Sequence, residues 1–208
     1  MSRPATAPEP DPVAVDIARA FAAGGALAAA VPGFVPRASQ ADMAATVHQA
    51  ILDGATLVAE AGTGTGKTFA YLVPALLAGG KLLISTGTKP LQDQLFRKDL
   101  PAVLKALKIN AATALLKGRA NYLCLHRMER AEGEALLSSR DDARHLRAIV
   151  RFAAATVSGD RAELSEVPES AAVWPLVTST RDNCLGAECP RFSGCFVFKA
   201  RRDAQAAD

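Results

Sequence analysis

Hydrophobic and polar positions in the first half of the chain switch repeatedly between helical spacing and short β-prone runs. The helical spacing is plainest in the segment after Ser39, where Met43, Val47 and Ile51 fall on one face. The elements predicted, in chain order, are a helix from Ser39 to about Leu52, a strand over 55–60, a helix over 67–78, a strand over 81–86 and a helix over about 89–107. Strands that alternate with helices form a parallel sheet, so the pattern predicts an α/β fold.

The alternation stops after Gly118. Residues 141–156 show the spacing of one amphipathic helix, but no further strand is evident before Val197. Three of the four cysteines lie in the stretch 183–196, which is punctuated by Pro and Gly. The pattern predicts a mostly helical subdomain inserted into the α/β core. At the other end, the Pro- and Ala-rich residues 1–12 are expected to be disordered, followed by a short helix over 13–22.

A glycine-rich loop joins the first predicted strand to the helix that follows it. Its eight residues are Ala61, Gly62, Thr63, Gly64, Thr65, Gly66, Lys67 and Thr68. In a phosphate-binding loop, glycines let the backbone turn its N–H groups towards a phosphate, and the helix N-terminus adds its positive dipole end. Lys67 would reach the β- and γ-phosphates, and Thr68 would bind Mg²⁺. The loop therefore predicts a nucleoside triphosphate site.

One position departs from the pattern G-x-x-x-x-G-K-[ST], because Ala61 replaces its first glycine. Alanine is a common variant at this position in helicases, so the departure from the pattern favours a helicase among the nucleotide-binding proteins. The alternative is a chance Gly-Thr repeat in a surface turn, which would have no reason to lie between a strand and a helix.

The 208 residues suffice for one full domain with an insertion, or for two small domains. The chain is 50% hydrophobic and 22% charged, and no apolar run is long enough to span a bilayer, so we expect a cytoplasmic protein without a membrane segment. The net charge is only +3, but residues 81–130 carry ten Lys or Arg against three acids. This basic segment indicates nucleic acid as a partner, although solvated helix faces would give the same charge pattern.

The spacing of the four cysteines leaves three interpretations open. Fifty-nine residues separate Cys124 from Cys184, and Cys189 and Cys195 follow closely. Disulfides are improbable beside a cytosolic nucleotide site. Structural zinc favours tighter cysteine pairs, whereas an iron–sulfur cube spreads its ligands farther apart. The cysteines could therefore hold a cluster or a zinc ion, or remain free thiols.

The second predicted strand ends in a polar segment, Ser85 to Leu95, that includes Thr86, Thr88 and Gln92. Its hydroxyls, amides and helix-start N–H groups would face the same sheet edge as the phosphate loop. Such groups can bind a nucleic-acid backbone without reading bases. A simple polar helix start is the alternative.

The phosphate loop, the segment 85–95, the run Lys117-Gly-Arg-Ala-Asn-Tyr-Leu-Cys124 and the three-cysteine cluster follow in this order. From about Phe34 to the C-terminus, the sequence resembles the DinG/XPD-like superfamily 2 DNA helicases. The resemblance implies ATP-driven 5′-to-3′ movement on single-stranded DNA, with Lys67 and Thr68 in the catalytic site. It also implies a 4Fe-4S cluster on the four cysteines, adenine sensing by Arg37 and Gln40, and DNA contacts from Thr86, Thr88 and Gln92.

The resemblance also implies a division of the chain. Residues 13–117 would be the N-terminal part of a RecA-like motor domain, 118–198 the cluster insertion, and 199–208 a truncated return to the motor domain. The chain contains no D-E-A-H box, which this family uses to bind Mg²⁺ and polarise water, and no second motor domain with arginine fingers. We therefore expect an N-terminal portion of a helicase, from a truncated gene product or a cloned fragment. The alternative is a non-enzymatic nucleotide- and metal-binding module that contacts DNA or senses redox state.

Overall fold

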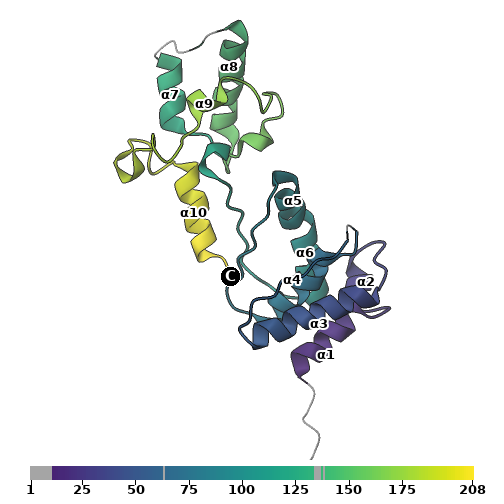
Figure 1. Cartoon of the computed structure of the whole chain (residues 1–208). Coiled ribbons are helices and arrows are strands. Elements are labelled where there is room, and N and C mark those ends of the chain that lie inside the picture. Colours follow the sequence, from purple (N-terminus) through teal and green to yellow (C-terminus); the bar gives the residue numbers. More distant parts are fainter. Residues whose placement is uncertain (1–10, 63, 134–136, 138) are drawn as a thin grey trace, which may run out of the picture. The chain divides into compact units, whose positions relative to one another are not determined.

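The computed structural model describes residues 11–62, 64–133, 137 and 139–208, and it divides into two compact units. The first unit ends at Ala112 and also includes Asp208, whereas the second runs from Thr113 to Ala207. Each unit has its own hydrophobic core. In Figure 1 the first unit is drawn in purple to teal and the second mainly in green to yellow. No described helix is both long and apolar enough to cross a bilayer.

The regular secondary structure described in the first unit is helical. Their bounds are α1 Pro12–Phe21, α2 Ala26–Ala30, α3 Ala38–Leu52, α4 Lys67–Ala78, α5 Lys89–Gln94, the π-helix η1 Leu95–Asp99 and α6 Leu100–Leu107. The predicted helices 13–22, 39–52 and 67–78 are confirmed within about one residue at each end. Of the segment 1–12 predicted to be disordered, residues 1–10 lie outside the described residues, and Pro12 begins α1.

The core of the first unit lies between α3 and α4, which pack against each other, with α1, α2 and α6 around them (Figure 1). Leu72 and Val73 of α4 and Val103 of α6 are completely buried in it. The Asp11 carboxylate fixes α1 twice, because it accepts a hydrogen bond from the backbone N–H of Val13 and lies 2.5 Å from Nε2 of His48 on α3. The contact with His48 lowers the pKa of Asp11 below its ordinary value.

The parallel sheet expected from the sequence is not found among the described residues, so that part of the α/β prediction is not confirmed. Residues 55–60 and 81–86 lie outside any helix or strand and form no β-ladder. Leu82 and Ile84 pack on the core, whereas the side chains of Val58 and Leu83 are 93% and 92% exposed. A β-prone run becomes a strand only when a neighbouring strand takes its backbone hydrogen bonds. Neither run has such a neighbour in the described part of the chain.

The long helix predicted over about 89–107 is divided into α5, η1 and α6. Pro101 has no N–H to donate to the preceding turn, so the helix cannot continue regularly there. The N–H of Leu100 bonds to the carbonyl of Leu95 instead, which widens the turn into a π-helix. Lys108, with φ +55°, ends the helix in the left-handed conformation.

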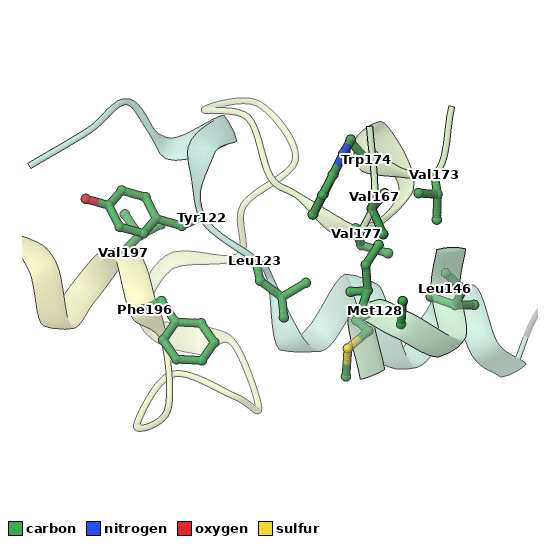
Figure 2. Packing of buried hydrophobic residues seen from close by; sticks show 13 residues of the cluster. Tyr122, Leu123, Met128, Leu146, Val167, Val173, Trp174, Val177, Phe196 and Val197 are labelled. Atoms are coloured by element: carbon green, nitrogen blue, oxygen red, sulfur yellow. The ribbon is translucent and has the colours of Figure 1, made fainter. Parts of the chain in front are cut away.

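Short helices and loops around one core form the second unit (Figure 2). The helices are η2 Arg119–Asn121, α7 Leu125–Gly133, α8 Arg140–Ala155, η3 Arg161–Glu163, α9 Trp174–Val177, η4 Gly186–Glu188 and α10 Phe196–Ala206. Helix α8 confirms the amphipathic helix predicted over 141–156. Residues 199–208, expected to start a return to the motor domain, are helical as far as Ala206. The predicted domain boundaries themselves stay predictions.

A buried ion pair lies beside two isolated β-bridges in this unit. Nζ of Lys117 is 2.7 Å from Oδ2 of Asp160, and both side chains are almost fully buried. The bridges join Tyr122 to Asp160 and Leu123 to Thr178. The ion pair and the bridges therefore hold the segment that leads into Cys124 against the loops around residues 160 and 178.

Replacing Asp160 by Asn should destabilise the second unit by about 3–5 kcal/mol, because the buried ammonium of Lys117 loses its counter-charge. Asn keeps an oxygen that can accept the hydrogen bond now donated by the N–H of Ala162. Urea unfolding followed by the emission of Trp174, the single tryptophan, measures the change. The matched control is Glu166→Gln, which breaks an exposed ion pair with Arg151 and should cost under about 1 kcal/mol. Equal effects of the two substitutions would contradict the prediction.

Candidate functional site

The glycine-rich loop folds directly into the N-terminus of α4. Gly66 precedes the helix with φ +82°, a left-handed conformation that strains any other residue. A Cβ at this position would also lie 2.0 Å from Nε2 of Gln40, so glycine is required on two grounds. Gly64 has φ +75° as well. Thr63, a predicted site residue, lies outside the described residues.

The ammonium of Lys67 lies within the curve of the loop. Its Nζ donates hydrogen bonds to the carbonyls of Ala61 and Gly62, at 2.5 and 2.7 Å. The hydroxyl of Thr65 donates to the Gly62 carbonyl at 2.9 Å, which closes the same turn. Lys67 is the first residue of α4, and Thr68 follows it. One positive charge and a helix N-terminus therefore meet in this loop, an arrangement suited to anions.

Arg37 and Gln40, predicted to sense adenine, hold the loop from the side of α3. Nη1 of Arg37 bonds to the carbonyl of Gly64, and Nε2 of Gln40 donates to the carbonyl of Gly66 at 2.9 Å. The side chain of Gln40 is buried, yet its Oε1 has no hydrogen-bond partner among the described residues. A buried acceptor without a donor is costly, so this oxygen is available to a donor group on a ligand.

A cavity of about 240 Å³ opens beside the loop. It is smaller than the roughly 300–1,000 Å³ of pockets that enclose whole ligands, so it can take part of a nucleotide. Its lining residues come from α3, from the segment before the loop and from the start of α4: Ser39, Gln40, Met43, Thr46, Leu57, Ala59, Glu60, Ala61, Thr65, Lys67 and Ala70. Sequence reasoning missed Ser39, Met43 and Thr46. Their helical spacing around Gln40 was the signal that could have found them.

The predicted DNA-contacting residues gather at the start of α5. The hydroxyl of Thr88 caps this helix by accepting the N–H of Leu91 at 3.4 Å. The hydroxyl of Thr86 donates to the carbonyl of Thr88 at 3.3 Å, and Gln92 lies half-buried one turn later. Both hydroxyls therefore take part in the helix start, which is also what the alternative of a simple polar cap requires.

All four cysteines line one small cavity in the second unit. Cys124 precedes α7, Cys184 and Cys189 lie on either side of η4, and Cys195 precedes α10. Each thiol is free and half-buried. No group of three or more Cys, His, Asp or Glu side chains among the described residues is arranged to hold a metal ion.

Hydrogen bonds and burial set the chemistry of these thiols. Sγ of Cys184 accepts from Nη1 of Arg119 at 2.9 Å and from the N–H of Gly186 at 3.4 Å. Burial raises the pKa of the Cys124 thiol, and the three other cysteines add to the rise. Metal ligation requires thiolates, so loading this site would release protons.

A comparison with known proteins finds a family match over the part of the chain that contains the glycine-rich loop. Residues 41–140 match the DEAD/DEAH box helicase family, a range that contains the whole phosphate loop. This match, together with the relatives described next, confirms the resemblance to DinG-like helicases.

Three relatives show how far the similarity extends. The chain is 54% identical over 191 residues to the ATP-dependent DNA helicase YoaA of Escherichia coli, an alignment of 90% of this chain and 30% of that protein. It is 38% identical over 208 residues to the ATP-dependent helicase DinG of Mycobacterium tuberculosis (88% and 31%) and 30% identical over 203 residues to the ATP-dependent DNA helicase DinG of Salmonella choleraesuis (86% and 28%). The chain thus spans about 30% of the length of these curated relatives.

Proposed function

We propose that the chain is the nucleotide-binding part of an ATP-dependent DNA helicase that moves 5′-to-3′ on single-stranded DNA in repair or replication. The observation that carries this proposal is the ammonium of Lys67, held inside a glycine-rich loop at the N-terminus of a 12-residue helix. The relatives, named as ATP-dependent helicases, support the same reading.

In this proposal the loop binds the triphosphate of ATP with Mg²⁺. The backbone N–H groups of Gly62, Gly64 and Gly66 would receive phosphate oxygens, and Lys67 would exchange its two carbonyl partners for the β- and γ-phosphates. The exchange is favourable because a charged acceptor binds an ammonium more strongly than a carbonyl does. Thr68 would place its hydroxyl on Mg²⁺.

The base of the nucleotide would lie in the cavity beside α3. Gln40 supports this placement, because the residue lines the cavity and its buried Oε1 lacks a donor among the described residues. The exocyclic amino group of adenine is such a donor. Arg37 would then position the loop through Gly64.

We further propose that Cys124, Cys184, Cys189 and Cys195 hold a 4Fe-4S cluster. The shared cavity and the hydrogen bonds donated to Sγ of Cys184 support a cluster, since such bonds stabilise ligated sulfur. The described residues contain no compact single-ion arrangement, which is compatible with the wider spacing of cube ligands. When bound, the cluster would supply iron–thiolate bonds that tie these loops together.

Single-stranded DNA is the proposed partner, with Thr86, Thr88 and Gln92 near its backbone. Their place at the start of α5 offers helix N–H groups together with polar side chains.

The 208-residue chain should bind ATP with Mg²⁺ but release at most traces of phosphate, because it contains no D-E-A-H box to position water and metal. Calorimetry measures the binding, and a phosphate assay with and without single-stranded DNA measures turnover. Robust DNA-stimulated turnover would show that other groups on this chain complete the catalytic site. Absence of ATP binding would overturn the nucleotide site, which the alternative of a non-enzymatic nucleotide- and metal-binding module also requires.

A further inference from the structure

Two aromatic rings pack against each other in a tilted arrangement at the surface of the second unit. The ring centroids of Phe192 and Phe198 are 4.3 Å apart, with an angle of 40° between the ring planes. Neither residue belongs to the hydrophobic core of this unit or to the layer packed against it. The neighbours Phe196 and Val197 point into that core (Figure 2), whereas Phe198 is 41% exposed. The two rings therefore form an apolar surface that is not part of the hydrophobic core.

The segment that carries Phe192 is held in place from both sides. Its N–H bonds to the carbonyl of Cys189, and its carbonyl accepts the N–H of Cys195. The preceding Arg191 forms a two-pronged ion pair with Glu129 of α7, at 2.6 and 2.9 Å. A surface aromatic that is fixed in this way loses little conformational entropy on binding a ligand.

Positive charge surrounds the rings on α10. Arg201 and Arg202 stand three and four residues after Phe198, so all three share one exposed helix face. Arg201 has no hydrogen-bond or ion-pair partner in the described part of the chain, and Arg202 lies 3.8 Å from Asp203. Lys199 adds a further cation, whose Nζ bonds to the carbonyl of Val157. The face therefore combines a tilted pair of aromatic rings with an excess of cations.

We propose that Phe192 and Phe198 form a stacking platform for a base of single-stranded DNA, with Arg201 and Arg202 binding the adjoining phosphates. Exposed aromatic rings beside cations are the combination by which proteins hold single strands without reading their sequence. Two rings offer too little surface for a stable protein interface, and the cations favour a polyanion. The inference rests on the proposed function, since it names a binding subsite for the same strand.

The test uses the 208-residue chain, prepared without oxygen, and a fluorescein-labelled oligothymidylate. Phe198→Ala should raise the dissociation constant roughly tenfold, and Phe192→Ala should act in the same direction. Phe198→Trp keeps a ring and should keep the affinity within about twofold, while its new emission is quenched by the stacked base. Val157→Ala removes an exposed apolar side chain of the same unit and should change nothing.

The salt dependence of the affinity for the oligonucleotide distinguishes the contribution of base stacking from that of phosphate binding. Arg201→Gln should lower the slope of log affinity against log salt by about 0.7, the value for one phosphate contact on a single strand. Phe198→Ala should leave that slope unchanged. The emission of Trp174, which is buried, reports in the variants without a new tryptophan whether the second unit remains folded.

The outcomes are distinct. Wild-type affinity in both alanine variants, or a Phe198→Trp variant whose emission the oligonucleotide does not quench, overturns the platform and leaves the helicase proposal standing. A wild-type chain that binds ATP but no oligothymidylate overturns the platform together with the proposed DNA partner.

Discussion

Replacing Lys67 by Ala should lower the affinity for ATP with Mg²⁺ by at least about 100-fold, since charge-assisted hydrogen bonds to two phosphates are lost. The fold should change little, because the hydrogen bonds of the ammonium to the described residues go to loop carbonyls that can accept hydrogen bonds from water. Isothermal calorimetry measures the affinity, and circular dichroism measures the helix content.

A matched control is Lys105→Ala, which removes an exposed lysine from α6 in the same unit. This variant should bind ATP as the wild type does. A second variant, Lys67→Arg, keeps the charge but not the compact ammonium, so it should recover only part of the affinity. Unchanged binding in Lys67→Ala would overturn the assignment of the phosphate loop.

The glycine-rich loop is held in its conformation by side chains that bond to its carbonyl groups. Three side chains from outside the glycine run, those of Arg37, Gln40 and Lys67, bond to its carbonyls. A loop fixed by such bonds keeps its N–H groups away from its own carbonyls and free to meet a phosphate. Arg37 and Gln40 thus have a positioning role in this structure, in addition to the adenine contact proposed for Gln40.

Local signals predicted the helices well, because each helix is started by residues near its own end. Ser139 caps α8 by accepting the N–H of Asp142, and Gly66 precedes α4 in a conformation that glycine adopts readily. Local signals were not sufficient for the predicted sheet, which is not found among the described residues. The β-prone runs 55–60 and 81–86 have the composition of strands, but their pairing depends on a neighbour elsewhere in the fold.

The candidate sites differ in the same way, because one is formed by neighbouring residues and the other by residues far apart in the sequence. The motif around Lys67 is contiguous, so eight neighbouring residues were enough to predict a phosphate-binding loop. The meeting of Cys124 with three cysteines about sixty residues later depends on the core of the second unit. There the N–H of Cys124 bonds to the carbonyl of Val177, at 2.8 Å. Spacing alone therefore left cluster, zinc and free thiols open, whereas the fold places all four thiols around one cavity.

Chain purified without oxygen should be brown and contain roughly four irons, as a cubane cluster with cysteine ligands requires. Replacing Cys124, Cys184, Cys189 or Cys195 by Ser should remove most of the iron and reduce amide protection in residues 118–198. The loops of this unit have few backbone ladders, so they depend on ligand bonds for stability. Elemental analysis and hydrogen exchange measure the two effects.

The same exchange experiment carries its own controls. Protection in residues 55–107 should not change, because α4 and α6 pack in the separate core of the first unit. Ser193→Ala, an exposed substitution between Cys189 and Cys195, should keep both iron and protection. One zinc and no iron in anaerobically prepared protein would overturn the cluster, and full protection in every cysteine variant would show that the packing around Trp174 and Ile149 holds the unit without metal.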